Sequence, residues 1–396
     1  MTAIANTKEL ELLTNQSDWS ICTTEAIKAN KEKSIISGPF GSNISSKFFV
    51  ANGIPVIRGN NLSLDIGVKF VDSGFVYVTE DKAIELDTWA TKDDLIFTAV
   101  GTIGQVGLLT GKESHAKYII SNKQLRLTVN QNIVLPQYAY YWFASRQMQE
   151  HIIQRNTGSS VPLINLAILK SLPIAIPPLS EQKAIAAILS SLDDKIALLH
   201  RQNAILEALS EALFRQWFVV EAKEEWEDIT IADLFILQRG FDLPAPQREP
   251  GHFPVIAASG YNGVHSQCQV KAPGVVTGRS GVIGSVFYIQ EDFWPLNTTL
   301  WIKKFKKGTP LYSFYVLKKL DLGIMNAGSA VPTLNRNHVH LIHQKMPPLE
   351  LMKKFEDIAV EYYIKIRLNQ TQIHTLEKLR DTLLPKLMSG EVRVQS

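Results

Sequence analysis

The stretch Asn156-Thr-Gly-Ser-Ser-Val-Pro162 recurs 170 residues later as Asn326-Ala-Gly-Ser-Ala-Val-Pro332. The same offset of 170 separates Pro177-Pro-Leu179 from Pro347-Pro-Leu349. An internal repeat constrains the architecture, because each copy is a structural unit of the same kind. The sequence therefore predicts two similar modules, each of which leads into a long helix.

The repeat extends upstream, where the two copies differ in length. Trp19 corresponds to Trp226 at an offset of 207, and Gly101 corresponds to Gly281 at an offset of 180. Because the offsets decrease toward 170, the first module carries extra loop residues. Short apolar runs and alternating segments in both copies indicate strands, at 93–99, 124–129, 274–278 and 299–303. Residues 138–153 and 311–320, rich in aromatic residues, indicate helices, so each module is expected to mix helices and strands.

The segment after the first repeat has the pattern of a coiled-coil helix. Residues 180–218 contain neither Pro nor Gly, and Ser180 offers an N-cap. Leucine recurs every seven residues, at Leu192, Leu199, Leu206 and Leu213. A helix of this length would extend over ~58 Å, which is more than one module covers. Its apolar seam therefore needs a partner.

The helix after the second repeat supplies that partner. An antiparallel alignment in which residue numbers add to 572 brings apolar residues together along the seam. It pairs Leu189 with Leu383, Ile196 with Leu376, Leu199 with Ile373, Leu206 with Ile366, and Asn203 with Asn369. A lone buried Asn costs stability but fixes the register, and an Asn–Asn pair would satisfy both amides. We expect an intramolecular antiparallel coiled coil, and the alternative is two amphipathic helices, each packed on its own module.

The composition indicates a soluble protein of a reducing compartment. The 396 residues are 45% hydrophobic and 20% charged, with a net charge of +3, which neither requires nor excludes a polyanionic partner. Cys22 and Cys268 are the two cysteines and lie far apart in the sequence, so no disulfide framework is indicated. The N-terminus lacks signal-peptide features, and no apolar run approaches the ~18 residues of a membrane span. We therefore expect a cytoplasmic protein without a membrane partner.

Taken together, these features resemble the specificity subunit of type I restriction-modification systems. Pro177-Pro-Leu-Ser-Glu-Gln-Lys-Ala-Ile185 and the residues that follow are similar to the family's first helical region. The segments Gly101–Val106 and Gly281–Val286, and Ile120-Ser-Asn122, are similar to its recognition domains. In the second copy Leu349 is followed by Glu350-Leu-Met, so only the Pro-Pro-Leu part is kept.

The resemblance implies an α+β fold, with two similar mixed α/β target recognition domains joined by two long helices that form an antiparallel coiled coil. The expected boundaries are 1–177 and 221–347 for the recognition domains, and 178–220 and 348–396 for the spacer helices. It also implies a non-catalytic subunit without cofactors that reads a bipartite, asymmetric sequence in double-stranded DNA. Its expected partners are two modification (methyltransferase) subunits and the restriction (endonuclease) subunits.

Candidate DNA-binding residues lie on Gly-containing loops. Arg58-Gly-Asn60-Asn61 and Arg279-Ser280 offer side chains that pair with base edges or phosphates. The repeated Gly-Ser loops offer Ser159 and Ser329 to phosphates, and Lys303 and Lys304 belong to the densest basic cluster. The alternatives are polar surface turns for the Arg58 and Arg279 loops, a structural turn leading into the next strand for the Gly-Ser loops, and a solvated hairpin for the lysines.

The sequence offers no clear catalytic or metal site. His338, His340 and His343 resemble a ligand cluster, but the first copy has Ile168, Lys170 and Pro173 at these positions, so we expect no metal. The motifs of a phosphate-binding loop, of a nuclease and of a methyltransferase that acts on amino groups are incomplete. The function that competes with DNA recognition is a non-catalytic scaffold whose two modules bind proteins or carbohydrate across a coiled-coil spacer.

The proposed register can be tested by crosslinking. In the double variant Asn203→Cys/Asn369→Cys, oxidation should form an intramolecular disulfide, because the two positions face each other in the seam. The crosslink is detected as a mobility shift on a non-reducing gel, with the two single variants as controls. Absence of the shift in the double variant would contradict this register.

Overall fold

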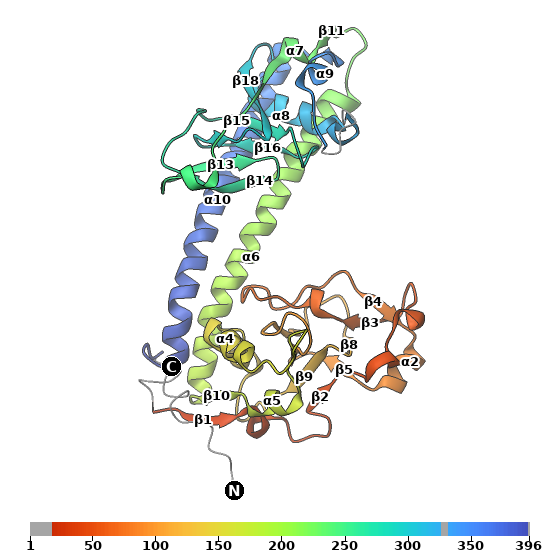
Figure 1. Cartoon of the computed structure of the whole chain (residues 1–396), viewed down its shortest axis with the longest axis vertical. Coiled ribbons are helices and arrows are strands. Elements are labelled where there is room, and N and C mark those ends of the chain that lie inside the picture. Colours follow the sequence, from red (N-terminus) through yellow and green to blue (C-terminus); the bar gives the residue numbers. More distant parts are fainter. Residues whose placement is uncertain (1–17, 326–331, 395–396) are drawn as a thin grey trace. The chain divides into compact units, whose positions relative to one another are not determined.

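The computed structural model describes residues 18–325 and 332–394 (Figure 1). The chain forms two compact units. The first contains the described residues up to Ile196 together with those from Thr375 onward, and the second comprises Ala197–His374. Two long helices, α6 (Leu179–Arg215) and α10 (Leu349–Ser389), each contribute one part to each unit. The fold is thus α+β, as expected, with mixed α/β modules on a helical pair.

The described strands of the first unit form a two-stranded sheet, β1-β10, and two four-stranded sheets, β2-β9-β6-β7 and β4-β3-β8-β5. Strands β3 and β8 pair in parallel, and the other strand pairs are antiparallel. The strand bounds are β1 Ser20–Thr23, β2 Ile35–Ser37, β3 Ile54–Ile57, β4 Val76–Val78, β5 Trp89–Thr91, β6 Asp94–Thr98, β7 Val106–Leu108, β8 Lys117–Ile120, β9 Gln124–Thr128 and β10 Pro173–Ile176. The helices are α2 Glu80–Leu86, α3 Pro136–Phe143, α4 Arg146–Gln154 and α5 Leu166–Ser171, with 3₁₀ turns at η1 Thr24–Ile27, η2 Gly41–Asn43, η3 Ser46–Phe48 and η4 Gly59–Asn61.

The second unit repeats this plan. Its described strands form the sheets β11-β19, β12-β18-β15-β16 and β14-β13-β17, and β13 and β17 are parallel. The strand bounds are β11 Glu227–Thr230, β12 Phe235–Arg239, β13 Phe253–Ala257, β14 Gly260–His265, β15 Gly274–Gly278, β16 Val286–Ile289, β17 Trp294–Pro295, β18 Thr299–Phe305 and β19 His343–Met346. The helices are α7 Ile231–Leu234, α8 Pro310–Lys319 and α9 Arg336–His340, a π-helical turn η5 Gln216–Val220, and 3₁₀ turns η6 Ala245–Gln247 and η7 Leu322–Met325.

Aromatic side chains of α3 and α8 form much of each core. In the first unit Phe143 of α3 meets Phe97 of β6 edge to face, with ring centroids 5.4 Å apart. In the second, Tyr312 of α8 meets Phe218 with centroids 4.9 Å apart. Burying each such ring contributes about 1.5–3 kcal/mol, so these helices hold the sheets to the long helices.

The expected single helix over 138–153 is wrong. It is two helices, α3 and α4, because Ser145 adopts an extended backbone and its Oγ accepts a hydrogen bond from Met148 N at 3.4 Å, which caps α4. The proposed cap at Ser180 is wrong as well. Helix α6 begins one residue earlier, and Gln182 N donates to Pro178 O at 2.9 Å.

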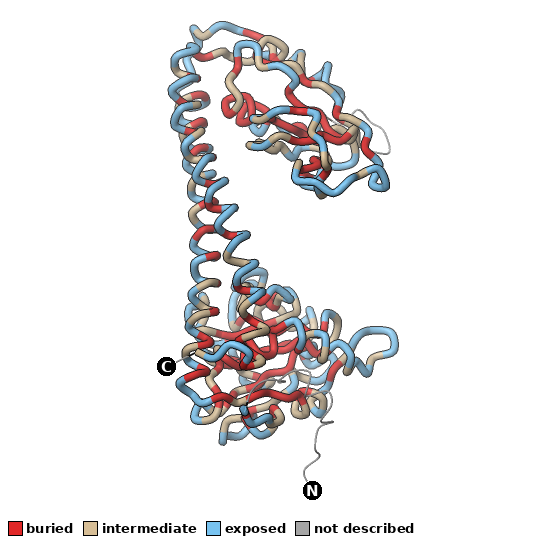
Figure 2. The backbone as a smooth tube through the Cα atoms, turned by 90° about the vertical axis from the view of Figure 1, so that its left-hand side faces the viewer, coloured by how far each residue is buried: buried red, intermediate tan, exposed pale blue. Residues whose placement is uncertain are grey.

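The long helices pair antiparallel in each unit, with buried positions recurring along each (Figure 2). Asn369 Nδ2 donates to Asn203 Oδ1 at 2.8 Å, and both residues are buried. This is the Asn pair of the sequence-based register, although Asn369 Oδ1 has no partner among the described residues. Buried seam positions are Leu189, Ile196, Leu199, Ile366 and Ile373, and half-buried ones are Leu192, Leu206, Leu213, Leu376 and Leu383.

A buried ion pair joins the two helices within the first unit. Arg380 Nη1 of α10 lies 3.2 Å from Asp193 Oδ1 of α6, and the two side chains are 8% and 3% exposed. Tyr141 OH of α3 donates to Asp193 Oδ2 at 2.5 Å. Burial raises the pKa of Asp193, an effect that Tyr141, Lys69 and Arg380 oppose. The carboxylate therefore depends on these partners to stay ionised in the core.

The matching positions of the second unit are uncharged. Tyr315 takes the place of Tyr141 in the aromatic helix, and Tyr363 and Ser210 stand 170 residues from Asp193 and Arg380. The hydroxyls of Tyr315 and Tyr363 are 3.1 Å apart and buried. The same junction is thus built from charges in one unit and from hydroxyl groups in the other.

Removing Arg380 should destabilise the first unit. The variant Arg380→Ala leaves the carboxylate of Asp193 buried without its arginine partner. We therefore expect a loss of about 3 kcal/mol in unfolding free energy. Asp381→Ala is the control, because Asp381 also contacts Arg380 but is 62% exposed, and it should cost less than about 1 kcal/mol. Denaturant unfolding measures both, and equal losses would show that the buried pair is not critical.

Candidate nucleic-acid interface

The loop after β3 is shaped by Asn61. Its Oδ1 accepts from Arg58 N at 3.0 Å, and its Nδ2 donates to Val71 O at 3.0 Å and Ser73 O at 2.8 Å. The side chain is fully buried. Asn61 was expected to contact DNA, but in this structure its amide is buried and bonded to the backbone. It holds the loop instead.

The two neighbouring candidates remain accessible. Arg58 Nη2 and Asn60 Nδ2 each donate to Gly74 O, both at 3.2 Å. Arg58 is half-buried and Asn60 is exposed. One shared carbonyl leaves further N–H donors on both side chains. These donors are suited to phosphate oxygens or base edges.

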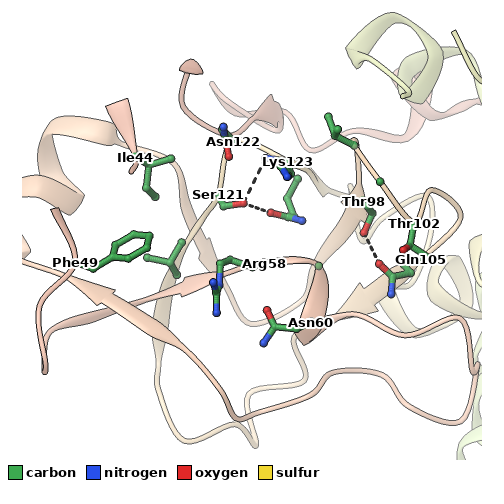
Figure 3. A pocket seen from close by; sticks show the side chains of 15 residues that line it. Ile44, Phe49, Arg58, Asn60, Thr98, Thr102, Gln105, Ser121, Asn122 and Lys123 are labelled. Atoms are coloured by element: carbon green, nitrogen blue, oxygen red, sulfur yellow. Dashed lines mark hydrogen bonds between the residues drawn. The ribbon is translucent and has the colours of Figure 1, made fainter. Parts of the chain in front are cut away.

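Arg58 and Asn60 line a hollow of about 550 Å³. Its other walls come from the β6–β7 connection, the β8–β9 turn, and the segment before β3 (Figure 3). Thr98 Oγ1 donates to Gln105 Oε1 at 2.8 Å, and Gln105 Nε2 donates to Leu62 O at 2.9 Å. The second of these bonds joins the β6–β7 connection to the loop after β3. The labelled lining residues in Figure 3 are Ile44, Phe49, Arg58, Asn60, Thr98, Thr102, Gln105, Ser121, Asn122 and Lys123.

The repeated Gly-Ser loop lies beside this hollow. Asn156 Oδ1 accepts from Gly158 N and from Leu163 N, both at 2.8 Å, and closes the loop. Gly101 N donates to Pro162 O at 2.9 Å and joins the loop to the β6–β7 connection. Ser159 of this loop is exposed. Its hydroxyl is therefore accessible to a ligand.

The second unit repeats this junction. Gly281 N donates to Pro332 O at 3.0 Å, as Gly101 N does to Pro162 O. Arg279 is half-buried, and its Nη1 donates to Asn297 O at 3.2 Å. The backbone N–H groups of Arg279 and Ser280 both donate to Thr298 O. Arg279 and Ser280 therefore lie on a fixed loop, whereas Ser329 falls in 326–331, outside the described residues.

The structure does not bring the lysine cluster to this loop. Lys303 and Lys304 are exposed on β18, and Lys304 pairs with Ile236 of β12. Arg279 adjoins Thr298, at the opposite end of β18, and five strand residues span roughly 16 Å. These two lysines thus form a separate basic surface within the second unit.

Comparison with known proteins shows to which protein family the chain belongs. Residues 41–208 and 223–378 match the type I restriction modification DNA specificity domain in two copies. The chain belongs to this family. The two matched segments correspond to the two repeats read from the sequence, together with most of each following helix.

Individual specificity subunits are similar to this chain over different shares of their length. The chain is 23% identical to the type I restriction enzyme MjaIX specificity subunit of Methanocaldococcus jannaschii, over 98% of this chain and 96% of that protein. It is 24% identical to the EcoBI specificity subunit of Escherichia coli over 34% of this chain and 29% of that protein. A crystal structure of a type I S subunit from M. genitalium has a TM-score of 0.66 and 19% identity, and covers 95% of this chain and 97% of its own. This last similarity shows the fold.

Some residues of the hollow were missed from the sequence. Asn122 and Lys123, on the β8–β9 turn, line it together with Gln105. Asn122 corresponds to Asn297 in the second copy, and this repetition could have drawn attention to it. Repetition alone, however, does not distinguish a residue that supports the fold from one that offers a donor at the surface. Lys123 and Gln105 carried no signal, because their position depends on how distant loops meet.

Of the three histidines that resemble a ligand cluster, His340 has a structural role. His340 Nε2 accepts a hydrogen bond from Leu237 N at 2.9 Å. Burial, with smaller effects from Arg336 and Lys306, lowers the pKa of His340 and favours the neutral ring that accepts this bond. Among residues 18–325 and 332–394 no group of three or more His, Cys, Asp or Glu side chains is placed to hold a metal ion. None of the described helices is long and apolar enough to cross a membrane.

Neighbouring asparagines should respond very differently to substitution. Asn61→Ala strands Arg58 N and two carbonyl groups, so we expect a loss of about 2–4 kcal/mol in unfolding free energy. Asn60→Ala removes one exposed hydrogen bond and should change stability by less than about 0.5 kcal/mol. Chemical denaturation of the two variants tests this, and similar losses would refute the loop-holding role of Asn61.

Proposed function

We propose that the chain is the DNA sequence-specificity subunit of a type I restriction-modification complex. The observation that carries the proposal is the pair of matching loop junctions, Gly101 with Pro162 and Gly281 with Pro332, each beside exposed or half-buried polar donors. Membership of the specificity-domain family over most of the chain supports it. Each unit would read one half of a bipartite target in double-stranded DNA.

The two half-sites should differ in sequence. Arg58 follows the Pro55-Val-Ile57 strand, and the second unit has Ala257 at that position. Arg279 corresponds to Ala99, since Arg279 O accepts from Leu334 N as Ala99 O accepts from Ile164 N. Each unit therefore offers an arginine where the other has alanine. Arginine pairs in bidentate fashion with guanine or binds phosphate, so this asymmetry supports an asymmetric target.

The long helices are proposed as the spacer and the docking region for partner subunits. The functional division would be recognition domains at 1–177 and 221–347 and spacer helices at 178–220 and 348–396. Two modification subunits, which methylate adenine from S-adenosylmethionine, and the restriction subunits would supply catalysis. The chain itself would position them on DNA, in the cytoplasm, without a cofactor of its own.

The proposal is tested by methylome sequencing of a host that carries this chain with its modification partner. Modification should occur at one bipartite motif with unspecified bases between its halves. Association of the purified complex with DNA should weaken as salt rises, because phosphate contacts release counterions. Modification without sequence preference, or no retention on DNA, would favour the scaffold alternative.

Two arginine variants should act on different half-sites. Arg58→Ala should relax selection in one half of the motif and Arg279→Ala in the other, each with a loss of roughly 5- to 150-fold in discrimination at one base pair. Arg146→Ala is the control, because Arg146 is exposed and pairs with Glu150 on α4. Methylation rates on targets substituted one base pair at a time measure the effect. A uniform loss on all DNA would make that arginine a phosphate contact instead.

A further inference from the structure

Phe40 is an aromatic ring without a packing partner at the edge of the first unit's interface. It is 91% exposed, although a phenylalanine side chain has a large apolar area to bury. Single exposed apolar residues are common. Exposure alone therefore does not indicate a function for Phe40. The evidence must come from how its loop is held in place and from which residues lie beside it.

The loop that carries the ring is fixed at its base. Gly38 N donates to Gln124 O at 2.9 Å, and a Cβ on Gly38 would lie 1.7 Å from Ser121 O. Asn122 Nδ2 donates to Gly41 O at 3.4 Å, and Gly41 has a φ of +47°, which favours glycine. The backbone, and not burial of the ring, therefore sets the position of Phe40.

The ring stands at the edge of the candidate DNA surface. A second hollow of about 500 Å³ is lined by Phe40 and Pro39 together with Leu163 and Asn165 from the far side of the Gly-Ser loop. It shares Val100, Asn122 and Gln124 with the hollow of Arg58 and Asn60. A duplex held by these donors would thus lie within reach of Phe40.

The second unit shows that the fold does not require an aromatic residue here. Gly240 N donates to Thr299 O at 3.1 Å, and a Cβ on Gly240 would lie 2.2 Å from Leu296 O. Gly240 thus corresponds to Gly38, whose N–H also donates to a strand carbonyl and which also lies too close to a carbonyl oxygen to carry a Cβ. Two residues beyond Gly240 stands Asp242, which accepts from Asn297 Nδ2 and from Arg239 Nη2. An exposed ring in one copy is thus replaced by a carboxylate bonded to its neighbours in the other.

We propose that Phe40 is a specificity-determining wedge, which enters the base stack of the half-site read by the first unit and distorts it. Apolar side chains placed at a groove can part neighbouring bases, at a cost that depends on which base step is opened. The carboxylate of Asp242 cannot act in this way, so only one half-site is distorted. The inference rests on the proposed function. It adds a way of selecting the DNA sequence in which the side chain makes no hydrogen bond to a base.

The test is 2-aminopurine fluorescence in the complex of the full chain with its modification subunit. The probe replaces adenines one at a time in both half-sites, except the adenines that are methylated, because a methyltransferase flips its target base out of the stack. Unstacking of a probe by the wedge raises its emission. The intact complex should raise the emission in the half-site that responds to Arg58→Ala and not in the other. Phe40→Ala should abolish the rise and weaken target binding by about 10-fold, as loss of one base–aromatic contact does.

Matched variants separate the wedge from a general effect. Phe40→Leu retains an apolar wedge and should keep part of the rise. Ile84→Ala removes another apolar side chain of the first unit, 60% exposed on α2, and should change nothing. Thermal unfolding and complex assembly establish that each variant folds.

The outcomes distinguish this inference from the proposed function. Sequence-selective binding without any rise in emission, or a rise that persists in Phe40→Ala, overturns the wedge and leaves the specificity function standing. An equal rise in both half-sites also overturns it. If the intact complex does not prefer its target over other DNA, the proposed function fails and the wedge fails with it.

Discussion

The hydrogen bond between Asn203 and Asn369 fixes the register of the two antiparallel long helices, and the rest of the structure depends on this register. Each long helix contributes to both cores. Ile185 and Leu189 of α6 and Leu384 and Leu387 of α10 belong to the first core, and other parts of the same helices belong to the second. A shift of one helix would therefore disturb both units at once. A buried amide pair resists this shift because a slipped register would leave its polar groups among apolar side chains.

The two units keep a common frame and vary the residues placed on it. The backbone bonds from Gly101 to Pro162 and from Gly281 to Pro332, and the close approaches at Gly38 and Gly240, occur in both units. Glycine is needed at the last two positions because a side chain would overlap a carbonyl oxygen. On this frame one unit carries Arg58 and Phe40 where the other carries Ala257 and Asp242. A duplicated fold can in this way present two unlike surfaces.

Regular patterns explain which parts of the fold were predictable. The apolar runs at β6, β15 and β18 and the aromatic helix α8 were placed within one or two residues, because period and turn residues are local properties. The expected helix over 138–153 failed because Ser145 can serve as a cap, which a hydrophobic pattern does not register. Arg380 occupies a seam position of α10, but its buried pairing with Asp193 and Tyr141 depends on segments distant in sequence.

The sequence by itself determined the two modules, the long helices and the Asn–Asn pairing, since repeats and heptads are periodic and leave few alternative alignments. Only the tertiary structure decided what the polar loop residues do. Asn60 and Asn61 are adjacent and of the same residue type, yet Asn60 is exposed whereas Asn61 is buried and bonded to three backbone groups. Lys303 and Lys304 likewise lie apart from Arg279, although both belong to the second unit. The physical reason is that the burial and direction of a loop side chain depend on neighbouring segments that no local pattern specifies.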